Sequence, residues 1–187
     1  MSLAYENVAA AATTARRKRR MCQASGCKAP LTLPTAHADA FTSVPYCGNP
    51  ACIVLLPMGY TAEAAWMQKV ADEMHLSETA FLLPRSEPHS YELRWFTPTD
   101  EVDLCGHATL ASSHVLWTVH GADPFQPLRF HTKSGVLSAT RDETGVIELD
   151  FPSEPASAVA DDDPDREQLL KAFGVAAIDV LFVGRNR

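Results

Sequence analysis

One carboxylate in this sequence has the surroundings that a general acid or base needs. Glu78 stands in the segment HLSETAFLL, between Leu76 and the apolar run at 79–83. Apolar surroundings disfavour the charged form of a carboxyl group, so that such a group can exchange a proton near neutral pH. The other interpretation of Glu78 is a solvated acid at the end of a strand.

A second set of candidates lies in DLCGHATLA, residues 103–111. Gly106 permits a close approach of the backbone, and the free N–H groups of a helix N-terminus bind anions such as a carboxylate. Cys105 and His107 would flank that anion site, and a helix N-terminus lowers the pKa of a thiol. The other interpretations are a buried structural cysteine and a histidine that caps the helix or belongs to the core.

Two more polar residues complete the candidate substrate-binding set. Asn49 lies in the Gly-Asn-Pro turn at 48–50, which either only shapes the chain or presents Asn49 to a pocket. Ser77 directly precedes Glu78. Together with Cys105 and Gly106, these residues are expected to surround a substrate.

The sequence shows no signature of a bound cofactor. It contains no glycine-rich phosphate-binding loop and no GxSxG motif. The five cysteines are odd in number and irregularly spaced, which favours neither a disulfide framework nor a metal site. We therefore expect no cofactor, no metal ion and a reducing, cytoplasmic location.

These candidates need a sheet and helices to position them. Apolar runs and alternating patterns predict strands at 51–56, 79–83, 91–96, 128–132, 135–141 and 146–151. Helices are predicted from an N-cap at Thr61 to about His75, and from Gly106 to about His120. The second helix has no formally charged side chain apart from any protonated histidine, which indicates a helix surrounded by protein. The sequence thus predicts an α+β fold, a curled and mostly antiparallel sheet around a central helix.

The chain is predicted to have four parts. They are a disordered or targeting tail at 1–35, a folded domain at 36–152, a linker at 153–165 and the start of a second domain at 166–187. One helix and one strand, the latter predicted at 180–183, have no partner for their apolar faces. We therefore expect the second domain to be truncated.

Charge and hydropathy restrict the partners. The net charge is −7, although the first 35 residues are basic through ARRKRR. An acidic body argues against a nucleic-acid ligand, which requires a basic footprint. No apolar run approaches the roughly 20 residues of a membrane-spanning helix. The basic segment leaves organelle targeting open as an alternative to the cytoplasm.

The sequence resembles the PhzF-like (phenazine biosynthesis-like) family through an ordered set of segments. They are DAFTSVPYCGNPACIVLL at 39–56, HLSETAFLL at 75–83, LRWFTPTDEVDLCGHATLA at 93–111, GVLSATR at 135–141 and LFVGRN at the C-terminal end. The resemblance implies a fold related to diaminopimelate epimerase, in which two similar domains each wrap a sheet around a helix. The active site of that fold lies between the two domains.

The resemblance also implies an activity. Known members need no cofactor, and the type member isomerises trans-2,3-dihydro-3-hydroxyanthranilate with a glutamate as general acid and base. The matching residue is Glu78, and the family's active-site glycine and histidine match Gly106 and His107. Cys105 matches a catalytic cysteine of related epimerases, but the SETAF segment favours the glutamate mechanism. The family also uses an aspartate and an anion-binding segment of the second domain, and no segment here matches them.

Three functions follow as hypotheses. The first is a cofactor-independent isomerase or epimerase acting on a small carboxylic acid, which this 187-residue chain alone would not catalyse. The second is a catalytically silent half-protein that dimerises through an exposed apolar face. The third is a small-molecule binder without turnover. We expect a homodimer and neither a nucleic-acid nor a membrane partner.

Overall fold

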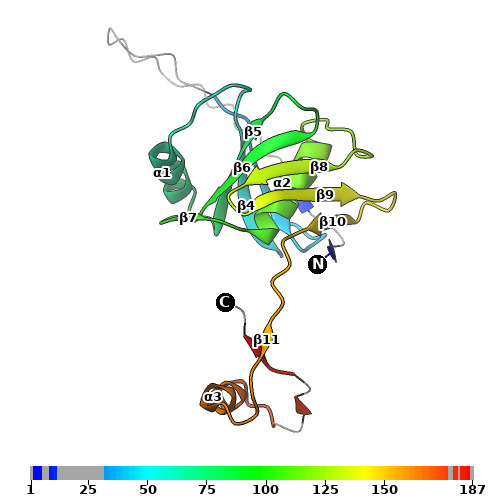
Figure 1. Ribbon diagram of the computed structural model, residues 1–187. Coiled ribbons are helices and arrows are strands. Elements are labelled where there is room, and N and C mark those ends of the chain that lie inside the picture. Colours follow the sequence, from blue (N-terminus) through cyan, green and yellow to red (C-terminus); the bar gives the residue numbers. More distant parts are fainter. Residues whose placement is uncertain (1, 6–8, 12–31, 177–178, 181, 186–187) are drawn as a thin grey trace. The chain divides into compact units, whose positions relative to one another are not determined.

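The computed structural model describes residues 2–5, 9–11, 32–176, 179–180 and 182–185 (Figure 1). The chain divides into two compact units, Met1–Pro152 and Ser153–Arg187. Over the described residues, unit 1 holds a ten-stranded sheet with two helices, and unit 2 holds one α-helix with a two-stranded sheet.

Unit 1 contains the elements that position the candidate residues. Its strands are β1 (Ser2–Tyr5), β2 (Ala9–Ala11), β3 (Thr35–Ala40), β4 (Asn49–Leu55), β5 (Glu78–Pro84), β6 (Ser90–Phe96), β7 (Glu101–Val102), β8 (Leu128–Thr132), β9 (Gly135–Arg141) and β10 (Ile147–Asp150). Its helices are α1 (Ala64–Met74) and α2 (Gly106–Thr118).

The sheet runs in the order β1-β10-β9-β8-β6-β5-β4-β3-β2, and β7 pairs with the end of β6. Two neighbouring pairs are parallel, β4 with β5 and β6 with β8. The other described pairs in this sheet are antiparallel. The prediction of an α+β fold with a curled, mostly antiparallel sheet around a central helix is confirmed (Figure 1).

The two parallel pairs explain why α1 and α2 lie on opposite faces of the sheet. Helix α1 connects β4 to β5, and α2 connects β6 to β8. Both connections step in the same direction along the sheet, but β4 and β6 run in opposite directions. Since crossovers between parallel strands share one hand, the two helices must cover opposite faces.

Helix α2 fills the inner face of the sheet, where it contacts β3, β4, β5 and β10. Nine of its 13 residues are buried, as the absence of charged side chains predicted. Two of its buried hydroxyls are satisfied within the helix itself. Thr109 donates to the carbonyl of Cys105 at 2.6 Å, and Ser113 donates to the carbonyl of Thr109 at 2.8 Å. These hydroxyls therefore need no partner from the sheet.

Helix α1 covers part of the outer face, where it contacts β5 and β6. Its residues Met67 and Ala71 are buried there. The helix begins after Glu63, not after Thr61 as predicted, and Glu63 makes no side-chain cap. Because β4 and β5 are covered by α2 on one face and α1 on the other, they read as continuous apolar runs.

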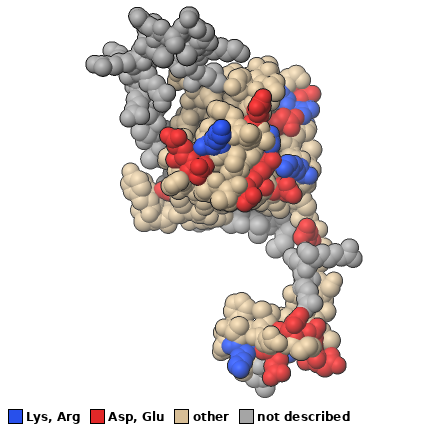
Figure 2. Space-filling model, turned by 90° about the vertical axis from the view of Figure 1, so that its left-hand side faces the viewer, with Lys and Arg blue, Asp and Glu red and all other residues tan. Residues whose placement is uncertain are grey.

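Strand β10 is buried on one face only, and its sequence alternates accordingly. Ile147 and Leu149 face the inner core, whereas Glu148 and Asp150 are exposed. In the hairpin turn before it, the Asp142 carboxylate accepts the N–H groups of Thr144 and Val146 at 2.9 Å each. Figure 2 shows acidic and basic side chains interspersed over one face of unit 1.

The N-terminal segment differs from its prediction. Residues 1–35 were expected to lie outside the fold, yet β1 pairs with β10 and β2 pairs with β3. Strand β3 itself begins at Thr35. Backbone pairing at a sheet edge needs no hydropathy pattern, so no pattern in the sequence indicates these short strands. Residues 6–8 and 12–31, with the basic cluster, lie outside the described residues.

Unit 2 consists of α3 (Pro164–Phe173) and the antiparallel pair β11 (Ser157–Ala158) and β12 (Gly184–Arg185). The ends of α3 follow local rules, with an Asp163 N-cap, proline in the first turn and Gly174 in the left-handed conformation as C-cap. The strand predicted at 180–183 is instead the short β12 that follows it. Among the described helices of both units, none combines the length and the apolar composition needed to cross a bilayer.

Candidate active site

The candidate residues converge where β4, β5 and α2 begin. Strands β4 and β5 are parallel with Ala51 opposite Glu78, so their first residues lie side by side. The Ser77 hydroxyl lies 2.9 Å from the carbonyl oxygen of Pro50 and 3.1 Å from Asn49 Oδ1. These contacts tie the start of β5 to the start of β4.

Gly48 permits this arrangement. A Cβ atom at this position would lie 2.4 Å from the carbonyl oxygen of Ala40 and 2.5 Å from a methyl group of Thr42. Contacts this short with backbone cannot be relieved by a side-chain rotation. The Gly-Asn-Pro turn is therefore a steric requirement that places Asn49 and Pro50 next to Ser77.

Helix α2 brings His107 to the same place. Its Nε2 lies 3.2 Å from Ser77 Oγ and 3.0 Å from Glu78 Oε2. The side chains of His107 and Glu78 are only 10% and 17% exposed. We call Asn49, Ser77, Glu78, Cys105 and His107 the site cluster.

Glu78 is the unsatisfied member of the site cluster. Its Oε2 atom is buried and has no hydrogen-bond partner among the described residues. The imidazole is close, but the 3.0 Å approach is not aligned as a hydrogen bond, and Nε2 has Ser77 as its aligned partner. Because buried polar atoms are nearly always paired, an orphan carboxylate oxygen indicates a group held ready for a ligand.

Burial determines the protonation of the two side chains beside Glu78. Burial lowers the pKa of His107, and the nearby charge of Glu78 opposes that effect only in part. Burial raises the pKa of Cys105 to about 12, against the backbone N–H of Ala108. The thiol is thus protonated at neutral pH, because desolvation outweighs the effect of the helix N-terminus, and this favours the buried cysteine over the activated one among the two interpretations of Cys105.

The two remaining predicted positions lie at the helix start. Cys105 is the N-cap of α2, and Gly106 is its first residue. A Cβ atom on Gly106 would meet only the ring of Phe151, at 3.4 Å, so the fold of unit 1 does not itself demand glycine here. Without a side chain, Gly106 adds no bulk at the first turn, where the N–H groups of a helix can bind an anion.

The site cluster also contains the donor types of a metal site. One atom each from Glu78, Cys105 and His107 lies within 4.8 Å of the others. However, the thiol lies 3.4 Å from Nδ1, whereas the carboxylate lies 3.0 Å from Nε2. An ion bound to either nitrogen would therefore face only one of the other two donors, and we derive no step through a metal.

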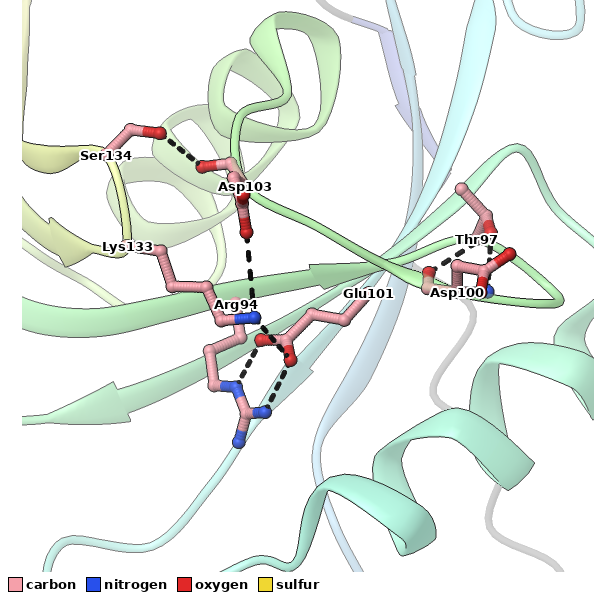
Figure 3. A network of polar contacts seen from close by, with 7 residues as sticks. All are labelled: Arg94, Thr97, Asp100, Glu101, Asp103, Lys133 and Ser134. Carbon is pink, nitrogen blue, oxygen red and sulfur yellow. Dashed lines mark hydrogen bonds and ion pairs between the residues drawn. The ribbon is translucent and has the colours of Figure 1, made fainter.

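A second polar cluster holds the segment that leads into α2 (Figure 3). Glu101 receives a bidentate pair from Arg94, with N–O distances of 2.7 and 2.8 Å, and a third contact from Lys133 at 2.8 Å. Lys133 also lies 3.6 Å from Asp103, and Ser134 donates to the carbonyl of Asp103 at 2.8 Å. We call these residues, Arg94, Glu101, Asp103, Lys133 and Ser134, the ion clamp.

The ion clamp anchors the chain just before the site. Glu101 and Asp103 precede Gly106 by five and three residues, and they are held to β6 and to the turn between β8 and β9. The hydrogen bonds from Arg94 hold the pKa of Glu101 down, to about 2, so its carboxylate stays charged. The sequence analysis did not predict this cluster, because the spacing of charged residues does not show which of them form ion pairs in the folded protein.

All six predicted site residues thus lie at the starts of β4, β5 and α2. The sequence did not indicate the Pro50 carbonyl or the steric role of Gly48, both of which follow from backbone geometry. A cavity of about 250 Å³ beside α1, which includes Tyr60, Phe81 and Arg94 in its lining, shares no residue with the site cluster.

Residues 38–181 match the family model of the PhzC-PhzF phenazine biosynthesis-like proteins. Over 157 residues the chain is 48% identical to an uncharacterized isomerase of Halalkalibacterium halodurans, covering 84% of this chain and 55% of that protein. The chain spans about half the length of the curated relatives it matches.

Solved structures agree with this match. A PhzF-family phenazine biosynthesis protein from Enterococcus faecalis is 39% identical with a TM-score of 0.62, over 74% of this chain and 50% of that one. A predicted epimerase from Pseudomonas aeruginosa is 25% identical with a TM-score of 0.59, over 81% of this chain and 54% of that one.

Proposed function

This chain belongs to the phenazine biosynthesis-like (PhzC-PhzF) family, and from that premise we propose that it carries the proton-transferring residues of a cofactor-independent isomerase. The substrate class is a small unsaturated carboxylic acid. Relatives named as an isomerase and a predicted epimerase support the reaction class. The site cluster supplies the groups for it.

The observation that carries this proposal is the buried, unpartnered Oε2 atom of Glu78. An oxygen already engaged by donors would be a weak base, because hydrogen bonds to the charged form favour that form. The free lone pairs of Glu78 are available to a C–H group of a substrate. The neighbouring imidazole, 3.0 Å away, is mostly buried and limits the access of water to this position.

The proposed reaction moves one proton within the substrate. The Glu78 carboxylate removes a proton from a carbon next to the unsaturated system, and the electrons of that C–H bond enter the conjugated system. The protonated Glu78 then returns the proton to a different carbon. The product is an isomer of the substrate, so the step needs no oxidant, reductant or second reactant.

The carboxylate of the substrate would bind at the start of α2. First-turn N–H groups of a helix have no intrahelical acceptor and carry a partial positive charge. Gly106 adds no side chain there, and Asn49 in β4 and Ser77, just before β5, border the same position. An anion held there would lie beside Glu78, where its position would fix which carbon faces the base.

Proton exchange with solvent tests the proposal. The probe is trans-2,3-dihydro-3-hydroxyanthranilate in deuterated water, with deuterium incorporation and product formation followed by NMR. Two proteins should be assayed: this chain alone, and the full-length relative from Halalkalibacterium halodurans. We expect Glu78→Gln, or its counterpart, to lower the exchange rate by about 10²- to 10⁴-fold, the usual contribution of a general base.

The matched control is Glu73→Gln, or its counterpart, which removes an exposed carboxylate of α1 outside the site cluster and the ion clamp and should leave the activity intact. Equal exchange by Glu78→Gln and the parent would refute Glu78 as the base. Prior treatment with EDTA should leave the exchange rate unchanged, and a loss restored by added Zn²⁺ would refute cofactor independence. Exchange by the full-length relative but not by this chain would support the expectation that the chain alone is inactive.

A further inference from the structure

The hydrogen-bond partners of His107 specify which ring nitrogen carries the proton. Around Nε2 the structure places oxygen atoms, Ser77 Oγ at 3.2 Å and Glu78 Oε2 at 3.0 Å. The carbonyl of Pro50 also favours a proton on this ring. A bare Nε2 lone pair facing these oxygens would be repelled, whereas an N–H group would be stabilised.

The Ser77 hydroxyl cannot itself supply that proton. It has a single hydrogen, and its nearest partner is the carbonyl oxygen of Pro50 at 2.9 Å, which can only accept. With the hydrogen directed to Pro50, Ser77 Oγ presents a lone pair toward Nε2. The aligned contact at 3.2 Å is therefore an Nε2–H donating to Ser77.

The other nitrogen faces a donor. Cys105 Sγ lies 3.4 Å from Nδ1, and the thiol is buried and retains its hydrogen at neutral pH. A thiol is a weak donor, and an unprotonated imidazole nitrogen is its natural acceptor. The titratable groups facing the ring are Glu78 from β5 and Cys105 from the start of α2, while β4 contributes only uncharged groups.

We propose that Cys105 is a positioning residue for His107: its S–H group donates to Nδ1 and holds the neutral ring as the Nε2–H tautomer. Hydrogen bonds then run in one direction, from Cys105 to His107, to Ser77 and to the Pro50 carbonyl. This series of hydrogen bonds does not include the Oε2 atom of Glu78. Cys105 thus acts on the site as a hydrogen-bond donor, although it is not the base.

The catalytic consequence rests on the proposed function. With its proton on Nε2 and directed to Ser77, His107 cannot remove a proton through that nitrogen. The positive end of its N–H dipole, not a lone pair, lies at the site, and this favours negative charge that develops on a substrate bound nearby. Glu78 is then the one base among the site-cluster residues that faces a substrate.

The experiment is ¹⁵N NMR on the full chain with labelled histidine, which distinguishes protonated from unprotonated ring nitrogens without any turnover. We expect a protonated Nε2 and an unprotonated, hydrogen-bonded Nδ1 for His107 at pH 7. Cys105→Ser keeps a donor and should retain this pattern. Cys105→Val removes the donor, so the Nδ1 signal should shift toward that of a free nitrogen.

The titration of the same signals gives a second readout. A hydrogen bond to the unprotonated Nδ1 favours the neutral ring, so its loss in Cys105→Val should move the His107 midpoint to higher pH. Cys105→Ser should stay with the parent. Signals of His114 and His131 monitor folding, and Cys105→Ala replaces the valine variant if it fails to fold.

A protonated Nδ1 in the parent would overturn the proposal, as would identical Nδ1 shifts and midpoints in the parent and the variants lacking a donor. Neither result depends on catalysis. Failure of the proposed function would appear as undiminished exchange by Glu78→Gln while the tautomer pattern of His107 stays as described.

Discussion

Two polar clusters stand close together in unit 1, and they are built in opposite ways. In the ion clamp, Glu101 is paired by both Arg94 and Lys133, with N–O distances from 2.7 to 2.8 Å. In the site cluster, Glu78 is similarly shielded, yet its Oε2 atom has no hydrogen-bond partner within the described residues. The side chains are 15% and 17% exposed, so burial alone does not separate them.

The difference distinguishes a carboxylate that stabilises the folded state from one that is available for proton transfer. Paired carboxylates stabilise the folded state and hold the chain in place. An unpaired one contributes little or costs stability, and it persists where the surrounding structure fixes it. Here the site cluster is fixed by backbone geometry at Gly48 and by the ion clamp, and Glu78 Oε2 accepts no hydrogen bond although His107 Nε2 lies 3.0 Å away.

The largest expected effect tests the backbone constraint on the site. In Gly48→Ala the new methyl group would lie 2.4 Å from the Ala40 carbonyl, so the turn must shift. We expect the free energy of unfolding to fall by about 2–3 kcal/mol, as for overpacked sites. Chemical unfolding followed by circular dichroism measures this loss. A variant as stable as the parent would show that the turn is not constrained.

The next effect tests the ion clamp. Glu101→Gln removes the charge that pairs with both cations and should lower the free energy of unfolding by about 1.5–2 kcal/mol, the lower part of the range for hydrogen bonds to charged groups, because the amide oxygen can still accept from Arg94. Thermal and urea unfolding at pH 7 measure it. A loss as small as that of an exposed ion pair, below about 0.5 kcal/mol, would contradict the assignment of Glu101 to stability.

The pH dependence of stability sharpens the same point. The pKa of Glu101 is lowered to about 2 in the folded state by its hydrogen bonds from Arg94. Its contribution is therefore complete above the ordinary carboxyl range and is lost as the pH falls from about 4.5 toward 2. The stability difference between the parent and Glu101→Gln should shrink across this window. Urea midpoints at pH 7, 5 and 3 measure it, and a constant difference would oppose the mechanism.

The smallest effect is the expected stability of Glu78→Gln. Because Oε2 has no hydrogen bond to lose, this variant should unfold within about 0.5 kcal/mol of the parent or be slightly more stable. Unfolding under the conditions used for Glu101→Gln gives a direct comparison. A loss matching that of Glu101→Gln would erase the distinction between the two clusters.

Hydropathy patterns predicted much of the fold, and the features that they did not predict have physical causes. The uncharged stretch after Gly106 predicted the inner helix because any helix surrounded by apolar side chains must avoid formal charge. The helix ends at Thr118, before the predicted His120. Strand pairing between β4 and β5, by contrast, depends on a crossover through α1 that no local pattern encodes.

The site was predictable in its members but not in its interactions. Glu78 and His107 stood out by residue type and surroundings, and the family resemblance supported both. The protonated state of Cys105 was not predictable, because it depends on burial by residues distant in the sequence. The ion clamp joins Arg94 in β6 through Glu101 in β7 to Lys133 in the turn between β8 and β9, so it too follows only from the tertiary structure.

The burial of α2 has a consequence for how unit 1 opens. The helix is buried among strands from early and late parts of the chain, β3 and β10 included. It has no polar face that water could solvate without exposing the inner core, so it cannot detach alone. Amide hydrogens along its length should therefore exchange with solvent only when the whole unit unfolds, whereas those of the outer helix α1 exchange through smaller local openings.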